Sequence, residues 1–224
     1  MDLRAKVESI IEALEAKFGV PQREARKDPL NVLIGAILSQ NTSDRNSGRA
    51  YQALRGRFPT WDDVLSAETD QIADTIRIGG LADQKARRIK DILLWIKKTH
   101  GRLNLDFICD MDPQDVIDTF CRLKGIGIKT MSVVLCFACG RDVFPVDTHI
   151  LRVSERLGLV PPKTPPDKAH RILGGLVPEG KAYPFHLNLL AFGRGICKAR
   201  DPKCEECPVP EYCLMKSGAM DLQG

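Results

Sequence analysis

A lysine and an aspartate that stand 18 residues apart are the two side chains best suited to covalent chemistry. Lys129 follows the turn Gly125-Ile126-Gly127 and is expected in the first turn of a helix, and Asp147 precedes another helical segment. A helix N-terminus and burial both disfavour an ammonium ion, so they favour the free amine of Lys129. A free amine attacks an aldehyde-like carbon and forms a Schiff base, and a carboxylate stabilises positive charge or assists removal of a proton. The pair therefore predicts nucleophilic chemistry at a sugar carbon.

The glycine turn before Lys129 predicts where a phosphate would bind. Gly125 and Gly127 allow a sharp turn and leave amide N–H groups pointing outward at the positive end of a helix. A phosphate bound there would bring its sugar near Lys129, and the anomeric carbon of deoxyribose becomes aldehyde-like once the base departs. A Schiff base at that carbon acidifies the neighbouring sugar proton and permits β-elimination of the 3′ phosphate. The motif therefore indicates an enzyme that works on DNA from its backbone side.

Each of these residues also has a structural interpretation. A lysine after a glycine turn is usually a solvated surface charge, and Asp147 is well placed to cap the helix that begins after it. We expect His149 to be a hydrogen-bonded structural residue and not a ligand. From spacing alone, the catalytic and the structural interpretations of the pair both stay open.

Four of the eight cysteines lie within 17 residues near the C-terminus. Their spacing, C-x6-C-x2-C-x5-C, predicts a metal centre, and zinc and a [4Fe–4S] cluster both remain open. The ligands would be Cys197, Cys204, Cys207 and Cys213. The first interval is basic and could contact DNA phosphates through Lys198, Arg200 and Lys203.

The other four cysteines are scattered among apolar residues: Cys109, Cys121, Cys136 and Cys139. Cys136 and Cys139 form a C-x-x-C pair in an apolar helical run. We expect small buried thiols there and not a redox pair.

Composition is that of a soluble protein with a full hydrophobic core. The chain has 224 residues, of which 43% are hydrophobic and 28% charged, and its net charge of +4 permits nucleic acid as a partner without requiring it. No apolar run is long enough to span a membrane, and the charged N-terminal segment is not a signal peptide. The expectation is a cytoplasmic protein.

Helical periodicity runs along most of the chain, and we find no alternating strand pattern of useful length. The fold class is therefore all-α. Helices are predicted at 3–18, 29–40, 43–58, after Thr60, and at 70–78, 83–100, 113–122, 166–176 and 183–196. In the helix at 83–100 we expect Ile89, Ile92, Leu93 and Ile96 to point inward, and Lys85, Arg87, Arg88 and Lys90 to point outward.

The two motifs together resemble a known family. Leu-x-Gly-Ile-Gly-x-Lys-Thr at 123–130 and Val-Asp-Thr-His at 146–149 are similar to the helix–hairpin–helix DNA glycosylases, most closely endonuclease III. The resemblance covers about residues 28–213. It implies that Lys129 forms the Schiff base, that Asp147 is the catalytic aspartate and that the four C-terminal cysteines hold a [4Fe–4S] cluster.

The resemblance also implies which residues contact DNA. The hairpin at 123–128 would bind the backbone through Gly125, Ile126 and Gly127. Gln40, Asn41 and Leu81 would fill the gap left by an extruded base. Near Asn41 the chain departs from the usual endonuclease III pattern, which leaves its lesion specificity open.

The implied protein has two lobes with a DNA-binding cleft between them. A six-helix lobe of about 25–140 ends in the hairpin, and residues 1–24 join 141–224 in a cluster-bearing lobe. The implied activity is a base-excision-repair DNA glycosylase with AP lyase activity, a monomer acting on damaged (oxidised) pyrimidines in double-stranded DNA. Two alternatives are a mismatch-specific thymine or uracil glycosylase and a non-catalytic helix–hairpin–helix DNA-binding protein.

Overall fold

The computed structural model describes residues 2–23, 25–216 and 218, and within them the secondary structure is helical with no β-strand. This confirms the all-α prediction. The chain divides into two compact units, one at Arg26–Arg141 and one that joins Met1–Ala25 to Asp142–Gly224. We call them the central unit and the terminal unit, and the parts of the predicted lobes at 1, 24, 217 and 219–224 lie outside the described residues.

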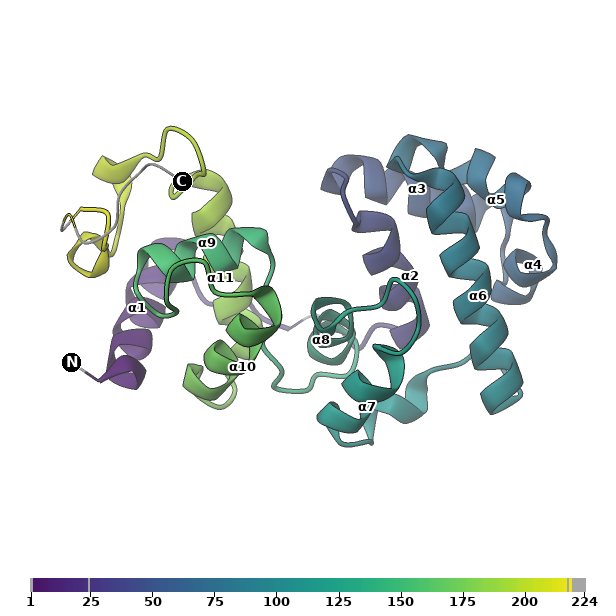
Figure 1. Cartoon of the computed structure of the whole chain (residues 1–224), viewed down its shortest axis with the longest axis horizontal. Helices are drawn as coiled ribbons and strands as arrows, with labels where there is room; N and C mark the ends of the chain where they lie inside the picture. Colours follow the sequence, from purple (N-terminus) through teal and green to yellow (C-terminus); the bar gives the residue numbers. More distant parts are fainter. Residues whose placement is uncertain (1, 24, 217, 219–224) are drawn as a thin grey trace. The chain divides into compact units, whose positions relative to one another are not determined.

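In the central unit, six helices precede the hairpin and one follows it (Figure 1). They are α2 (Pro29–Ser39), α3 (Asp44–Arg57), α4 (Trp61–Ser66), α5 (Thr69–Ile76), α6 (Ala82–His100), α7 (Pro113–Phe120) and α8 (Ile128–Phe137), with short 3-10 turns η1 (Arg77–Gly79) and η2 (Asp106–Cys109). The most apolar of them is α2, which packs against α3, α6 and α8. Its Leu30, Leu33 and Ile37 are completely buried, so this helix forms the middle of the core.

In the terminal unit, the two ends of the chain share one core. Its helices are α1 (Leu3–Phe18), α9 (Thr148–Arg156), α10 (Pro166–Leu176) and α11 (Ala182–Gly195), followed by η3 (Cys204–Glu206) and η4 (Pro210–Tyr212). The apolar face of α1 packs on α10 and α11 through Val7, Ile10 and Leu14, as its periodicity predicts. In the part of the chain that the structure describes, no helix is long and apolar enough to cross a membrane.

Helix starts agree with the capping signals in the sequence. Thr60 and Asp63 form a reciprocal capping box at the start of α4, and Asp28 accepts a hydrogen bond from the backbone N–H of Asn31 at the start of α2. These caps fix the residues at which α4 and α2 begin.

The prediction that Lys85 points outward is wrong. Lys85 is 1% exposed, and its Nζ donates hydrogen bonds to the carbonyl oxygens of Leu38 at 2.7 Å and Gly79 at 2.8 Å. Those carbonyls end α2 and η1, where no further helical turn supplies a donor. A buried ammonium therefore satisfies two helix ends that the hydrophobic pattern alone does not reveal. Ile89, with the other apolar residues of its face, is buried as predicted.

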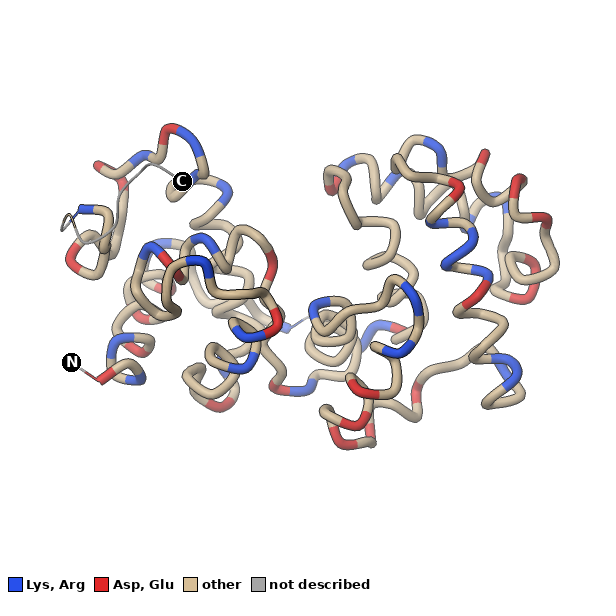
Figure 2. Tube along the Cα trace, viewed as in Figure 1, with Lys and Arg blue, Asp and Glu red and all other residues tan. Residues whose placement is uncertain are grey.

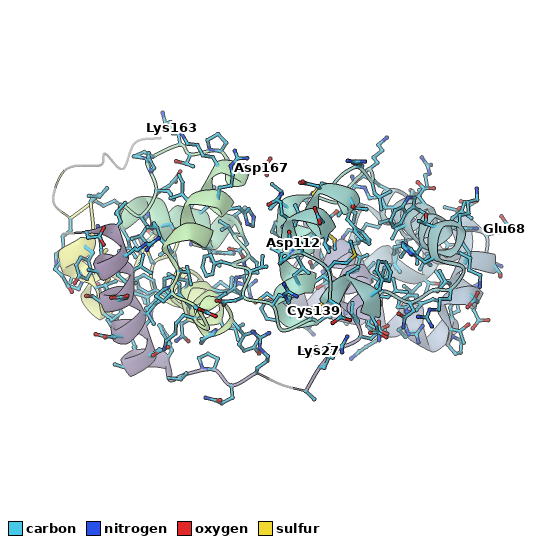
Figure 3. The ribbon with its side chains drawn as sticks, turned by 90° about the horizontal axis from the view of Figure 1, so that it is seen from below. Lys27, Glu68, Asp112, Cys139, Lys163 and Asp167 are labelled. Atoms are coloured by element: carbon cyan, nitrogen blue, oxygen red, sulfur yellow. A yellow bond between two sulfur atoms is a disulfide. The ribbon has the colours of Figure 1, made fainter. Side chains whose placement is uncertain are left out.

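The prediction of a buried free thiol is wrong for Cys139. Cys109 in η2 and Cys139, which follows α8, form a disulfide, with their Cα atoms 4.8 Å apart (Figure 3). The two residues are 30 positions apart, so tertiary packing and not sequence spacing brings them together. Cys136 is buried and outside any disulfide.

Candidate DNA-facing site and cysteine cavity

The hairpin between α7 and α8 is built from short backbone hydrogen bonds. The backbone N–H of Leu123 donates to Phe120 and that of Ile126 donates to Leu123, at 3.0 and 3.1 Å. Gly125 has φ of +89°, a conformation that favours glycine. Ile126 is buried and anchors the hairpin, while Lys129 is the second residue of α8 and is half-buried. The loop therefore presents the N-terminus of α8 and the lysine together.

Gln40 and Arg88 hold the hairpin from inside the central unit. Gln40 Nε2 donates to the carbonyl oxygen of Gly125 at 3.1 Å, and Gln40 Oε1 accepts a hydrogen bond from Arg88 Nη1 at 2.7 Å. A Cβ at Gly125 would lie 2.4 Å from Arg88 Nε, so a side chain there would displace the Arg88 guanidinium. The Gln40 side chain is thus engaged at both ends of its amide.

Asn41 and Leu81 share an unusual backbone. Asn41 has φ of 52° and Leu81 has φ of 50°, left-handed values that a leucine rarely adopts. Both side chains are exposed, and Leu81 is 51% exposed at the start of α6. Gly80, with φ of +67°, supplies the turn that precedes Leu81. An apolar side chain held outward at a strained position is the geometry expected of a wedge.

Asp147 is the N-cap of α9. Its Oδ1 accepts a hydrogen bond from the backbone N–H of Ile150 at 2.8 Å, so the structural interpretation of this residue is confirmed. The residue is half-buried behind the buried Val146. One carboxylate oxygen, Oδ1, makes the cap. The second oxygen is also a hydrogen-bond acceptor and can contact a ligand.

Two arginines of α9 connect this helix to the first predicted cysteine ligand. Arg152 Nη2 donates to the carbonyl oxygens of Gly193 at 2.8 Å and Cys197 at 3.0 Å, and lies 3.4 Å from His149 Nδ1. Burial, and secondly the charge of Arg156, lowers the pKa of Arg152. Arg156 Nη1 donates to the carbonyl oxygen of Lys198 at 2.6 Å and lies 3.4 Å from Cys197 Sγ. The helix that Asp147 caps therefore also holds the loop that begins at Cys197.

All four C-terminal cysteines line one cavity of about 240 Å³, together with residues that include Arg156, Ile196 and Pro202. Among the residues that the structure describes, no set of three or more histidine, cysteine or acidic side chains is arranged around a single metal ion. A single water occupies about 30 Å³, so the cavity has room for a polyatomic group. Burial, and to a smaller degree the neighbouring cysteines, raises the pKa of Cys207. Four soft thiols around a wide cavity fit an iron–sulfur cluster.

The basic loop after Cys197 presents its charges unequally. Arg200 and Lys203 are exposed, whereas Lys198 is half-buried. Lys203 Nζ donates to Glu206 Oε1 at 2.9 Å, and this hydrogen bond and charge raise the pKa of Lys203. Figure 2 shows further basic residues along α6 and in the loop between α7 and α8 of the central unit.

The structure brings some of the predicted residues together and places others in different units. The structure brings Gln40 to the hairpin at Gly125 and brings the four cysteines to one cavity. Lys129 belongs to the central unit and Asp147 to the terminal unit. Sequence reasoning missed the structural roles of Lys85 and Arg88. The signal for Lys85 was present, because it stands four residues before Ile89 and so shares the buried face of α6.

Comparison with known proteins agrees with this architecture. Residues 34–179 match the family model described as HhH-GPD superfamily base excision DNA repair protein. Endonuclease III of Thermotoga maritima is 32% identical over 208 residues, covering 92% of this chain and 92% of that protein. Endonuclease III of Sulfolobus acidocaldarius is 34% identical, covering 81% of this chain and 79% of that protein.

A protein of Arabidopsis thaliana with a provisional name as a DNA glycosylase is 38% identical over 80% of this chain, and the match spans 64% of its length. Among solved structures, a non-covalent endonuclease III–DNA complex matches with a TM-score of 0.83 at 24% identity, covering 98% of this chain and 99% of that one. A thermostable thymine-DNA glycosylase matches with a TM-score of 0.79 at 24% identity, covering 96% and 98%. The chain therefore belongs to the HhH-GPD superfamily of base excision DNA repair proteins, with endonuclease III among its relatives.

Proposed function

We propose that this protein is a DNA glycosylase with AP lyase activity that removes damaged (oxidised) pyrimidines from double-stranded DNA. The observation that carries the proposal is the position of Lys129, in the first turn of α8 directly after a hairpin built for close backbone approach. Membership of a base excision repair family and relatives named endonuclease III support it. The hairpin amides would bind a DNA phosphate, and the adjacent lysine would reach the sugar.

In the proposed reaction, Lys129 Nζ attacks C1′ of the damaged nucleotide. The glycosidic bond between C1′ and the base nitrogen breaks, and the base leaves with the bonding electron pair. The sugar ring then opens, O4′ takes the amine proton, and the C1′–N bond to the lysine becomes a Schiff base. Loss of a C2′ proton breaks the C3′–O bond and releases the 3′ phosphate. Asp147 would stabilise positive charge on the sugar or assist proton removal through its second carboxylate oxygen.

The target base must leave the duplex before this chemistry can begin. We propose that Asn41 and Leu81 enter the space it vacates, because both are exposed and lie at strained backbone positions. Backbone contacts would come from the hairpin, and further phosphate contacts from Lys198, Arg200 and Lys203.

The cysteine cavity is the proposed site of a [4Fe–4S] cluster, held by Cys197, Cys204, Cys207 and Cys213. Bound there, the cluster would cross-link the C-terminal loop and so fix its basic residues, a structural contribution. Arg156 would place a positive charge and a hydrogen bond at the Cys197 thiolate.

Removal of thymine or uracil opposite guanine is the second candidate, because a thymine-DNA glycosylase shares this fold. A panel of duplexes separates the candidates: thymine glycol, 5-hydroxycytosine, G·U, G·T and an abasic site, each assayed for base release and for strand cleavage. The proposal expects excision of the oxidised pyrimidines with cleavage 3′ to the site. Excision confined to the G·U and G·T duplexes would favour the second candidate. Binding without product on every duplex would favour a non-catalytic DNA-binding protein.

A further inference from the structure

Two cationic side chains of α6, Lys85 and Arg88, connect three separate segments of the central unit. Lys85 and Arg88 are one helical turn apart, so they project from the same side of the helix. Lys85 Nζ donates to the carbonyl oxygens of Leu38 and Gly79, and Arg88 reaches Gly125 through Gln40. The end of α2, the turn η1 and the hairpin are thereby tied to a single element.

Each tied backbone position lies beside a residue with a proposed DNA contact. Leu38 and Gln40 lead directly to Asn41, and Gly79 stands two residues before Leu81. Left-handed backbone at residues other than glycine is strained, and it persists where the surroundings over-determine it. The hydrogen bonds from α6 constrain the segments next to both strained positions.

Close packing leaves these loops little freedom to shift. A Cβ at Gly79 would lie 3.1 Å from Ala50 Cβ, and a Cβ at Gly125 would lie within 3 Å of three atoms of Arg88. Lys85 is buried and Arg88 is half-buried, so neither side chain extends into solvent where it would contact DNA. Their geometry is that of a support behind the DNA-facing residues.

We infer that Lys85, Arg88 and Gln40 are positioning residues that hold Asn41, Leu81 and the hairpin in one fixed arrangement for base extrusion. This inference rests on the proposed function. It assigns Gln40 a role that differs from gap filling: its amide bridges α6 and the hairpin, and Asn41 and Leu81 are the residues that enter the DNA.

The test compares Gln40→Leu, Arg88→Met and the double variant with the native protein. Arg87→Met is the matched control, because Arg87 is an exposed cation beside Arg88 on the same helix. Thermal unfolding establishes that each variant is folded. The first readout is the fluorescence of 2-aminopurine placed next to an abasic-site analogue in a duplex, which rises when the base stack is opened and requires no chemistry.

We expect the native protein and Arg87→Met to raise the fluorescence, and Gln40→Leu and Arg88→Met to bind the duplex without raising it. Single-turnover base excision from a thymine glycol duplex should fall about 10-fold to 100-fold in both variants. Borohydride trapping on a single-stranded oligonucleotide with a preformed abasic site, which needs no extrusion, should fall by a clearly smaller factor than base excision does, because the variants loosen the hairpin and leave Lys129 itself in place. The double variant should be no worse than the weaker single variant, because both remove one shared bond.

Three results overturn the inference. Multiplicative losses in the double variant would show that Gln40 contacts DNA independently of Arg88. A normal fluorescence rise in folded Gln40→Leu would show that the bridge does not govern extrusion. No rise with the native protein would show that this arrangement does not open the base stack. A native protein that raises fluorescence but forms no borohydride adduct would refute the proposed chemistry and leave the inference standing.

Discussion

The guanidinium of Arg88 lies against the backbone of Gly125, so that a Cβ at residue 125 would approach Arg88 Nε to 2.4 Å. This contact joins α6 to the hairpin, and a side chain at residue 125 would have to displace Arg88. A second and independent reason for glycine at this position is its positive φ.

Gly125→Ala should therefore destabilise the protein and weaken its DNA binding. Backbone strain and the collision with Arg88 together should lower the free energy of unfolding by about 1–3 kcal/mol. Gly127→Ala is the control for stability, because a Cβ there meets no atom within 4 Å and its φ is −118°. Urea unfolding measures both variants, and equal losses would contradict the steric account.

The burial of Lys85 predicts a pH-dependent stability. Burial, and secondly the charge of Arg88, lowers the pKa of Lys85 from its ordinary value of 10.5. The unfolded chain then binds more protons than the folded one between the lowered pKa and 10.5, so the free energy of unfolding rises with pH in that window. Urea unfolding at increasing alkaline pH should show this rise in the native protein and a flatter profile in Lys85→Met. Parallel profiles would mean that the titration of Lys85 does not cause the pH dependence of stability.

The Cys109–Cys139 disulfide encloses α7, the hairpin and α8 in one covalent loop. Closing a loop of this length restricts the unfolded chain, so Cys139→Ser should lower the free energy of unfolding by about 2–4 kcal/mol. A thiol reductant should lower the unfolding midpoint of the native protein toward that of Cys139→Ser. The reductant should leave the unfolding midpoint of Cys139→Ser unchanged. An equal shift in both proteins would show that the reductant acts on something other than this disulfide.

The cysteine cavity predicts iron and not zinc. Purified protein should contain about four iron atoms and acid-labile sulfide, with broad visible absorbance. Cys204→Ser should lose the absorbance and most of the iron, whereas Cys121→Ser, in the central unit, should keep both. Stoichiometric zinc without sulfide would contradict the assignment.

How far the sequence predicts this molecule depends on whether a feature is local. The amphipathic pattern of α1 and the capping box at Thr60 are local signals, and the structure agrees with both. The cysteine spacing is also local, and the structure brings its four cysteines to one cavity. The burial of Lys85 is set by carbonyls at Leu38 and Gly79, which no periodicity marks. Because Lys85 is polar, hydrophobic periodicity does not mark it as part of the buried face of α6.

Other features depend on contacts between distant segments. The Cys109–Cys139 bond needs η2 beside the end of α8, and the Gln40 bridge spans 85 residues to Gly125. Neither is encoded in the spacing of the residues involved. The roles of Lys129 and Asp147 rest on motif and position, and they remain predictions about chemistry.

The most direct test of the central claim is covalent trapping at Lys129. Native protein is mixed with abasic duplex DNA and borohydride, and the adduct is digested and mapped by mass spectrometry. Lys129→Gln is the test variant, and Lys98→Gln, an exposed lysine of the same unit, is the control. The account predicts a single modified residue, Lys129, with the adduct lost in Lys129→Gln and kept in Lys98→Gln. An adduct that persists in Lys129→Gln, or maps to another residue, would contradict it.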